Sequence, residues 1–298
     1  MQRNRRRYLL LALIVFLGGC VLFTRQSALA AYTAPGFAEN VFHSDKAQGK
    51  NGGLIDASTV SEGYVGVSIR SNKQIKFQVT YGQVNYNYNV NANGAASFFP
   101  LQSGSGTYRF RLLENTGDNR YRELCSVTTD VALKDEFQPF LRSSTYVPYT
   151  KDSNCVKKAA ELAKNKATAL EVVTAVFDYM RTNITYDYEK AKTVKSGYLP
   201  NPDELLKSGK GICFDYSALA AAMLRSQGIP TKMIFGYVAP NNIYHAWNMF
   251  YTKETGWVTV GYQVSKDSWN RLDITFSAGG KDISEIISAK NYSDVYFY

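Results

Sequence analysis

The hydrophobic positions of residues 63–133 repeat with a period of two, which is the pattern of half-buried β-strands. Apolar or aromatic side chains alternate there with small or polar ones. The alternating positions are Val65, Val67 and Ile69, then Ile75, Phe77, Val79 and Tyr81, then Val84, Tyr86, Tyr88 and Val90, then Tyr108, Phe110 and Leu112, with a further strand expected over 121–133. Asn93-Gly94 predicts a hairpin turn. Short strands between polar turns indicate a small antiparallel β-sandwich over residues 61–150.

Helical spacing replaces this alternation after residue 150. Helices are expected over 155–166, from a capping box at Thr168-Ala-Leu-Glu171 to about Asn183, and over 214–227. The last of these is rich in Ala and Leu, so it must be buried, and Gly228 supplies its left-handed cap. Apolar runs predict strands over 232–238, 244–251 and 257–260. The mixture predicts an α+β domain over residues 151–298.

The first thirty residues have the anatomy of an export signal. Arginines crowd residues 3–7, an uncharged apolar run follows from Tyr8 to Phe23, and an A-x-A sequence ends at Ala30. We expect a signal peptide over 1–30, cleaved after Ala30, and a linker over 31–60. An uncleaved membrane anchor is a second interpretation, and a lipid anchor at Cys20 is a third. Each of them predicts a folded part that is secreted or held at the cell surface.

Export changes the meaning of the net charge. The whole chain carries +9, but removal of the five arginines of the signal leaves 29 basic against 25 acidic residues, or +4. This is an ordinary charge for solubility and gives no reason to expect a nucleic-acid partner. With only two histidines and no Cys-x-x-Cys pair, the composition excludes a His-rich zinc site, and no metal or other cofactor is predicted.

Export also allows two cysteines of the folded part to form a disulfide. Cys125 and Cys155 could pair, and the alternative is two small buried thiols. The sequence does not decide between them.

Cys213 occupies a position suited to a nucleophile. Gly209 and Gly211 indicate a tight turn, and the predicted helix begins directly after the cysteine. Free backbone N–H groups at a helix start favour a thiolate and can stabilise an oxyanion. The structural alternative is a small buried thiol. Asp215 either tunes this site electrostatically or stabilises the first helical turn. Tyr186, Tyr188 and Tyr198 are expected to serve mainly in packing, and the alternative is that one of them contacts the substrate or helps to form the oxyanion hole.

Two further residues complete a candidate set. His245 begins a predicted strand and is the only histidine beyond residue 43, which itself falls in the expected linker. Asp273 lies within an apolar alternation, where an unpaired carboxylate would be costly and a partner imidazole would explain it. The alternatives are a structural histidine and an aspartate that caps a turn.

The residues around all three resemble the transglutaminase-like superfamily, whose members share a papain-like core. The motifs are GKGICFDYSALAAAMLRSQGIPTKMIFGYV, YHAWNMFYTKETGW and WNRLDITFSAG, and the resemblance runs from about residue 155 to 280. It implies that Cys213 is the nucleophile, His245 the general base and Asp273 the acid that orients the imidazole. The region before residue 150 resembles, more weakly, an accessory β region of exported bacterial members.

The sequence departs from the family at the acid. Many members carry the aspartate just after the Trp that follows the His-Ala-Trp strand, where this chain has Gly261. We expect an inserted strand or hairpin over 258–268, with Asp267 as the second candidate for the acid.

The resemblance implies an exported thiol enzyme that acts on protein or peptide amides, including those of the cell envelope. Water would resolve the thioester in a peptidase or amidase, and a lysine amine would resolve it in a transglutaminase; the sequence does not choose. The rival interpretation is an envelope binding or scaffolding module with a relic site. A membrane partner is expected only through an uncleaved signal or the lipid anchor at Cys20.

Overall fold

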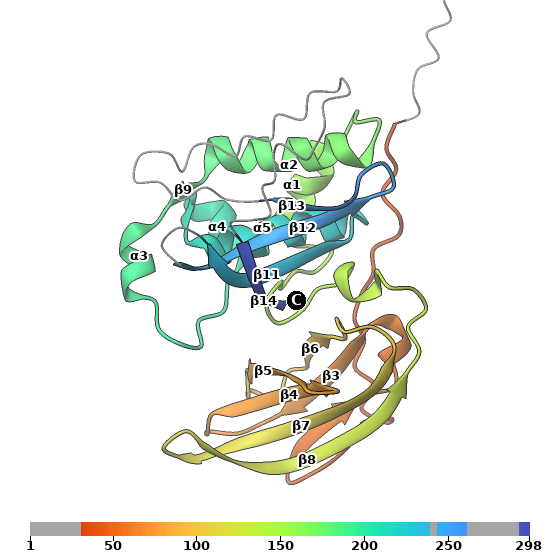
Figure 1. The fold of residues 1–298 in the computed structure, drawn as a ribbon, viewed down its shortest axis with the longest axis vertical. Coiled ribbons are helices and arrows are strands. Elements are labelled where there is room, and N and C mark those ends of the chain that lie inside the picture. Colours follow the sequence, from red (N-terminus) through yellow and green to blue (C-terminus); the bar gives the residue numbers. More distant parts are fainter. Residues whose placement is uncertain (1–30, 239–242, 261–291) are drawn as a thin grey trace, which may run out of the picture. The chain divides into compact units, whose positions relative to one another are not determined.

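The computed structural model describes residues 31–238, 243–260 and 292–298 (Figure 1). Residues Ala31–Tyr298 form one compact unit. Among the described residues, none of the helices has the length and apolar character that a membrane-spanning helix needs. The described elements are mixed, with antiparallel sheets and packed helices, and the predicted α+β class is confirmed.

The first part of this unit contains two four-stranded antiparallel sheets. One has the order β1 (Gln48–Lys50), β2 (Gly53–Asp56), β3 (Tyr64–Ile69) and β6 (Ser97–Pro100); the other has the order β5 (Val84–Val90), β4 (Ile75–Tyr81), β7 (Gly106–Gly117) and β8 (Arg120–Val131). Alternate side chains of β4 and β7 are buried, as a period of two requires, whereas β3 is buried at nearly every position. The rings of Phe77 and Phe99, one from each sheet, lie 4.7 Å apart, so the two sheets share a core.

Two local predictions in this region are wrong. The expected linker over 31–60 contains β1 and β2, which are short and lack a regular alternation that would have revealed them. The Asn93-Gly94 turn joins no hairpin, because the strands on its two sides, β5 and β6, belong to different sheets. Gly94 instead has a φ of +92° and donates its N–H to the Ile69 carbonyl, so the turn carries the chain across from one sheet to the other.

Three helices were predicted from the sequence, and the described residues contain five, of which the third and fourth were not predicted. The five are α1 (Asn154–Ala163), α2 (Ala169–Asn183), α3 (Tyr188–Thr193), α4 (Pro202–Ser208) and α5 (Cys213–Ser226), with short 3-10 turns at Val60–Glu62 and Gln138–Phe140. Thr168 caps α2 by accepting the Glu171 N–H, and the helix ends at Asn183 as predicted. Gly228 closes α5 with a φ of +74°. Nearly every residue of α5 is buried, which explains its run of small and apolar residues from Ala218 to Leu224.

A third four-stranded antiparallel sheet packs against α5, with α1, α2 and α4 on the other side of that helix (Figure 1). Its order is β13 (Gly256–Val260), β12 (Ile243–Thr252), β11 (Thr231–Val238) and β14 (Tyr292–Phe297), and a small parallel pair joins β9 (Thr185–Tyr186) to β10 (Lys210–Gly211). The three strands predicted after α5 are confirmed. Strand β14, at the end of the chain, was not predicted.

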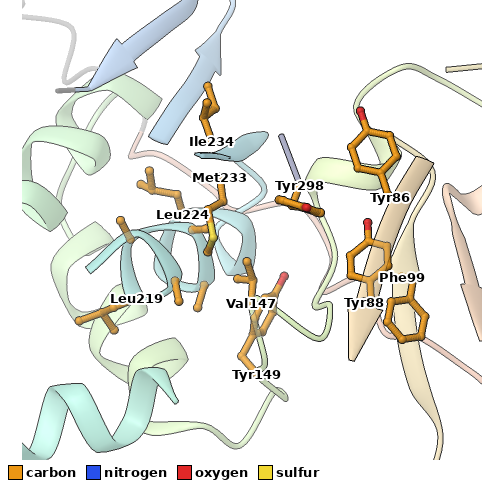
Figure 2. Packing of buried hydrophobic residues seen from close by; sticks show 14 of the residues in the cluster. Tyr86, Tyr88, Phe99, Val147, Tyr149, Leu219, Leu224, Met233, Ile234 and Tyr298 are labelled. Carbon is orange, nitrogen blue, oxygen red and sulfur yellow. The ribbon is translucent and has the colours of Figure 1, made fainter. Parts of the chain in front are cut away.

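One continuous hydrophobic cluster includes residues from both parts of the unit. Figure 2 shows Tyr298, which follows β14, lying between the tyrosines of β5 and the residues around α5. Its ring centroid is 5.4 Å from that of Tyr88 and 5.8 Å from that of Tyr86. The buried Arg225 of α5 donates to the Tyr298 and Arg142 carbonyls. The division into domains at residue 150 stays a prediction.

Candidate functional site

Cys213 is the first residue of α5, and the chain just before it, at Gly211 of β10, passes close to that helix. A Cβ on Gly211 would lie 2.9 Å from the Asp215 Cβ and 2.6 Å from the Leu205 side chain, so glycine is needed there. The Asp215 carboxylate accepts the Ile212 N–H at 2.9 Å and thereby stabilises the start of the helix. The local structure thus fixes Cys213 at a helix N-terminus, as predicted.

Cys213 is partly exposed as a residue, but the surroundings of its thiol do not favour a resting thiolate. Burial raises the pKa of the Cys213 thiol above its usual range, although the backbone N–H groups of Ala246 and Phe214 act in the opposite direction. The negative charge of Asp215 raises this pKa further. A thiolate was predicted from the position of Cys213 at a helix start alone. The sequence does not report the burial of the sulfur, which has the opposite effect on its pKa.

His245 lies on β12, where it pairs with Gly236 of β11, and its side chain is buried. Burial lowers the pKa of His245 to about 4, so its imidazole is neutral at pH 7. The N–H of the next residue, Ala246, is among the backbone groups that act to lower the pKa of the Cys213 thiol. The structure therefore brings the chain segments of Cys213 and His245 together, from an α-helix and a strand more than thirty residues apart.

A buried amide fixes the alignment of these two elements. The Asn248 side chain, fully buried on β12, donates to the Ser217 carbonyl of α5 at 3.0 Å and to the Lys232 carbonyl of β11 at 3.3 Å. Ser217 is one helical turn beyond Cys213, and Asn248 is three residues beyond His245. Asn248 was not predicted as a site residue, although a polar residue inside an apolar strand was an available signal.

The predicted acid, Asp273, and the second candidate, Asp267, both lie outside the described residues. The expected insertion over 258–268 also lies largely outside them, beyond the end of β13 at Val260. Within the described ranges, no group of three His, Cys, Asp or Glu side chains is arranged to hold a metal ion.

Asp215 is also the centre of an ionic network that the sequence did not reveal. Its carboxylate accepts from Lys190 Nζ at 2.6 Å and from the Tyr198 hydroxyl at 2.5 Å, and Lys190 Nζ lies 2.7 Å from that hydroxyl. Burial lowers the pKa of Lys190, but the bonds to Asp215 and Tyr198 outweigh it and raise the pKa overall. Asp215 thus serves both the helix start and the loop after α3.

Tyr186 of β9 lies next to the candidate nucleophile. The main-chain N–H of Cys213 is directed at the Tyr186 hydroxyl, and burial raises the pKa of this phenol. The tyrosine is therefore a neighbour of one of the helix-start N–H groups that can stabilise an oxyanion.

The other two folded-part cysteines are free thiols, so the structure corresponds to the second of the two alternatives for Cys125 and Cys155. Cys125 Sγ lies 3.7 Å from the Gly53 carbonyl, and Cys155 is buried at the start of α1. Burial raises the pKa of both thiols, which makes them poor nucleophiles.

The fold and the site define an α+β domain in which a cysteine is the first residue of a buried helix and a histidine lies on an antiparallel strand that packs against this helix. Residues 156–262 match the family described as the transglutaminase-like superfamily, which confirms the predicted resemblance of this region to that superfamily.

Two curated proteins are similar to part of the chain. The uncharacterised protein YebA of Bacillus subtilis is 28% identical over 136 residues, which cover 40% of this chain and 18% of YebA. The UPF0252 protein MJ1282 of Methanocaldococcus jannaschii is 29% identical over 103 residues, covering 33% of this chain and 28% of MJ1282. The chain thus spans less than a third of the length of either relative.

Solved structures resemble the chain more distantly. A proposed cysteine protease from Cytophaga hutchinsonii has a TM-score of 0.40 and 16% identity, covering 78% of this chain and 73% of its own. The periplasmic domain of TgpA from Pseudomonas aeruginosa has a TM-score of 0.35 and 17% identity, covering 76% and 78%.

Proposed function

We propose that this protein is a thiol enzyme that cleaves or transfers protein or peptide amides through a thioester on Cys213. His245 is the general base, and Asp273 orients its imidazole and stabilises the imidazolium that forms during the reaction. The observation that carries the proposal is the packing of α5 against β12, where Asn248, three residues after His245, donates to the carbonyl of Ser217, one helical turn after Cys213. The match to the transglutaminase-like superfamily supports the same chemistry at a coarser level.

The protonation states at rest determine how the first step begins. A neutral imidazole can accept a proton, and a neutral thiol can give one, so His245 removes the Cys213 proton as the sulfur attacks the amide carbon. The carbon–sulfur bond forms, and the carbonyl electrons move to an oxyanion beside the helix N-terminus. The imidazolium then protonates the leaving amine as the carbon–nitrogen bond breaks, which leaves a thioester.

The second step decides the class of enzyme. If water attacks the thioester, the products are a carboxylic acid and the free thiol, and the protein is a peptidase or amidase. If a lysine amine attacks it, the product is an isopeptide bond. We propose a substrate outside the cytoplasm, including proteins of the cell envelope, because the first thirty residues have the pattern of an export signal.

One property of the site favours the rival function, a binding or scaffolding module. Burial raises the pKa of Cys213 and lowers that of His245, so the resting pair is neutral and the thiol is a weak nucleophile. A relic site would also hold a neutral thiol and a neutral imidazole. The measured reactivity of Cys213 therefore has to distinguish an enzyme from a binding or scaffolding module.

Alkylation of the native full-length protein with iodoacetamide tests the proposal. Peptide mapping should find carbamidomethylation at Cys213 well before Cys125 and Cys155, because only Cys213 is partly exposed in the folded part. Cys213→Ala should abolish both this label and turnover. A Cys213 that reacts no faster than the two buried thiols would favour the scaffolding module.

A fluorescent primary amine then separates transfer from hydrolysis. Incorporation of the amine into a protein acceptor that depends on Cys213 identifies a transferase. Cleavage without incorporation identifies a hydrolase.

A further inference from the structure

A cavity of about 330 Å³ lies beside the candidate site. Ile212 and Phe214, which flank Cys213 in the chain, line it, and so does Tyr244, which precedes His245. The cavity therefore touches the chain on both sides of the nucleophile and directly before the base. A substrate held at Cys213 would place its neighbouring groups in or near this space.

Aromatic rings form one part of its wall, and polar groups of the loop 194–199 and of Asn89 form much of the rest. The Phe214 ring is 5.0 Å from Phe235 and 5.5 Å from Tyr146 in edge-on arrangements, and Phe235 stacks at 6.1 Å on Tyr244. Tyr298 closes the wall at 5.6 Å from Phe235. Rings in such a set offer both faces and edges to a further ring, and each favourable aromatic pair adds to simple burial.

Three separate parts of the chain complete the cavity. The loop 194–199 lines one side, and Asn89 of β5 contributes from the N-terminal sheets. A Cβ on Gly197, whose φ is +89°, would lie 3.3 Å from the Asn89 amide, so the loop runs close to that strand. The cavity thus depends on the N-terminal sheets as well as on the transglutaminase-like region.

The loop wall is held in place by the network around Asp215. Tyr198, which lines the cavity, donates to the Asp215 carboxylate, and Lys190 binds both groups. Asp215 also accepts the N–H of Ile212, another lining residue. One buried carboxylate therefore connects the cavity wall to the helix start that carries Cys213.

We propose that this cavity is a specificity subsite that receives a large aromatic side chain of the peptide substrate, next to the amide attacked by Cys213. The inference rests on the proposed function and adds the substrate class to it. The volume lies at the lower end of the range for small-molecule sites, so it suits one large side chain rather than a folded segment. Its aromatic wall gains most from an aromatic occupant, which loses little conformational freedom on binding.

The test uses thiol-reactive probes instead of an unknown substrate. The full-length protein is treated with the chloromethyl ketones of N-acetyl-phenylalanine and N-acetyl-alanine, and peptide mapping follows the loss of free Cys213. In this reaction the sulfur displaces chloride and forms a thioether. Each rate constant is divided by the rate constant for iodoacetamide, which has no side chain to place.

The phenylalanine probe should react about tenfold faster or more than the alanine probe, which corresponds to burial of one phenyl ring. Tyr244→Ala, which removes part of the wall, and Ser196→Trp, which fills the cavity from an exposed loop position, should each reduce this preference at least fivefold. Tyr237→Ala is the matched control: Tyr237 is exposed on the neighbouring strand, pairs with Tyr244 and does not line the cavity.

Equal normalised rates for the two probes, with normal iodoacetamide labelling, would overturn the subsite and leave the proposed function standing. The same holds if Tyr237→Ala reduces the preference as much as Tyr244→Ala does. Failure of all three reagents to label Cys213 would overturn the proposed function and the subsite together.

Discussion

Acidification should destabilise this protein through His245. The side chain is buried, and burial lowers its pKa to about 4, whereas the unfolded chain has the ordinary value of about 6.5. Above pH 6.5 both states hold a neutral imidazole, and the group does not affect the unfolding equilibrium. As the pH falls from 6.5 towards 4, the unfolded state gains a proton that the folded state does not, so stability is lost. Between pH 7 and pH 4.5 the loss from this group is about 2 to 3 kcal/mol.

Urea unfolding at a series of pH values measures this loss, and the scarcity of histidine makes the comparison clean. His43 is the only other histidine, and its Nδ1 lies 3.3 Å from Asp56, so His43→Gln provides a background from which the second contribution is removed. In that background, the curve of the chain that retains His245 should fall more steeply below pH 6.5 than the curve of the His245→Gln variant.

Parallel curves would refute the reasoning, because they would mean that His245 titrates alike in the folded and unfolded states. A difference of the opposite sign would mean that a carboxylate outweighs burial and charges the imidazole. Asp273→Asn and Asp267→Asn would then identify which carboxylate does so.

Three other substitutions test the framework of the site, each by urea unfolding. Asp215→Asn should lower the free energy of unfolding by about 2 kcal/mol, because the hydrogen bonds to a charged carboxylate are lost while the partly exposed Lys190 remains solvated. An unchanged free energy of unfolding would contradict the network around Asp215. Asn248→Asp should cost about 3 kcal/mol or more, since a buried carboxylate cannot donate to the carbonyls that Asn248 binds, and a wild-type midpoint would refute that alignment. Gly228→Ala should lower the free energy of unfolding by about 1 to 2 kcal/mol, because the backbone at this position is left-handed. The new Cβ would lie 2.0 Å from the Pro35 ring, so proteolysis near Pro35 should become faster. Unchanged cleavage there would contradict the contact between Gly228 and Pro35.

The elements of the second half of the chain were largely predictable, because their signals are local. The cap at Thr168 and the glycine at Gly228 fix helix ends through the chain next to them, and the Ala-rich composition of α5 reports its burial. The position of Cys213 at a helix start follows from the same kind of information. Strands β1 and β2 were missed because they are too short to show a period.

The chemistry around the candidate site was less predictable, because it depends on residues distant in the sequence. The raised pKa of Cys213 and the lowered pKa of His245 arise from burial, which no local motif reports. The bond from Lys190 to Asp215 joins residues 25 positions apart. The cavity needs Asn89 from a sheet that the motifs of the transglutaminase-like region do not include.

The central claim is that Cys213 forms an acyl thioester with help from His245. A stopped-flow experiment with p-nitrophenyl acetate measures this directly, with intact-mass analysis and peptide mapping of the quenched protein. The account predicts a burst of nitrophenolate of about one equivalent, an acetyl group on Cys213, and loss of the burst in both Cys213→Ala and His245→Gln. A burst that persists in Cys213→Ala, or a wild-type protein that shows no acetyl-Cys213, would contradict it.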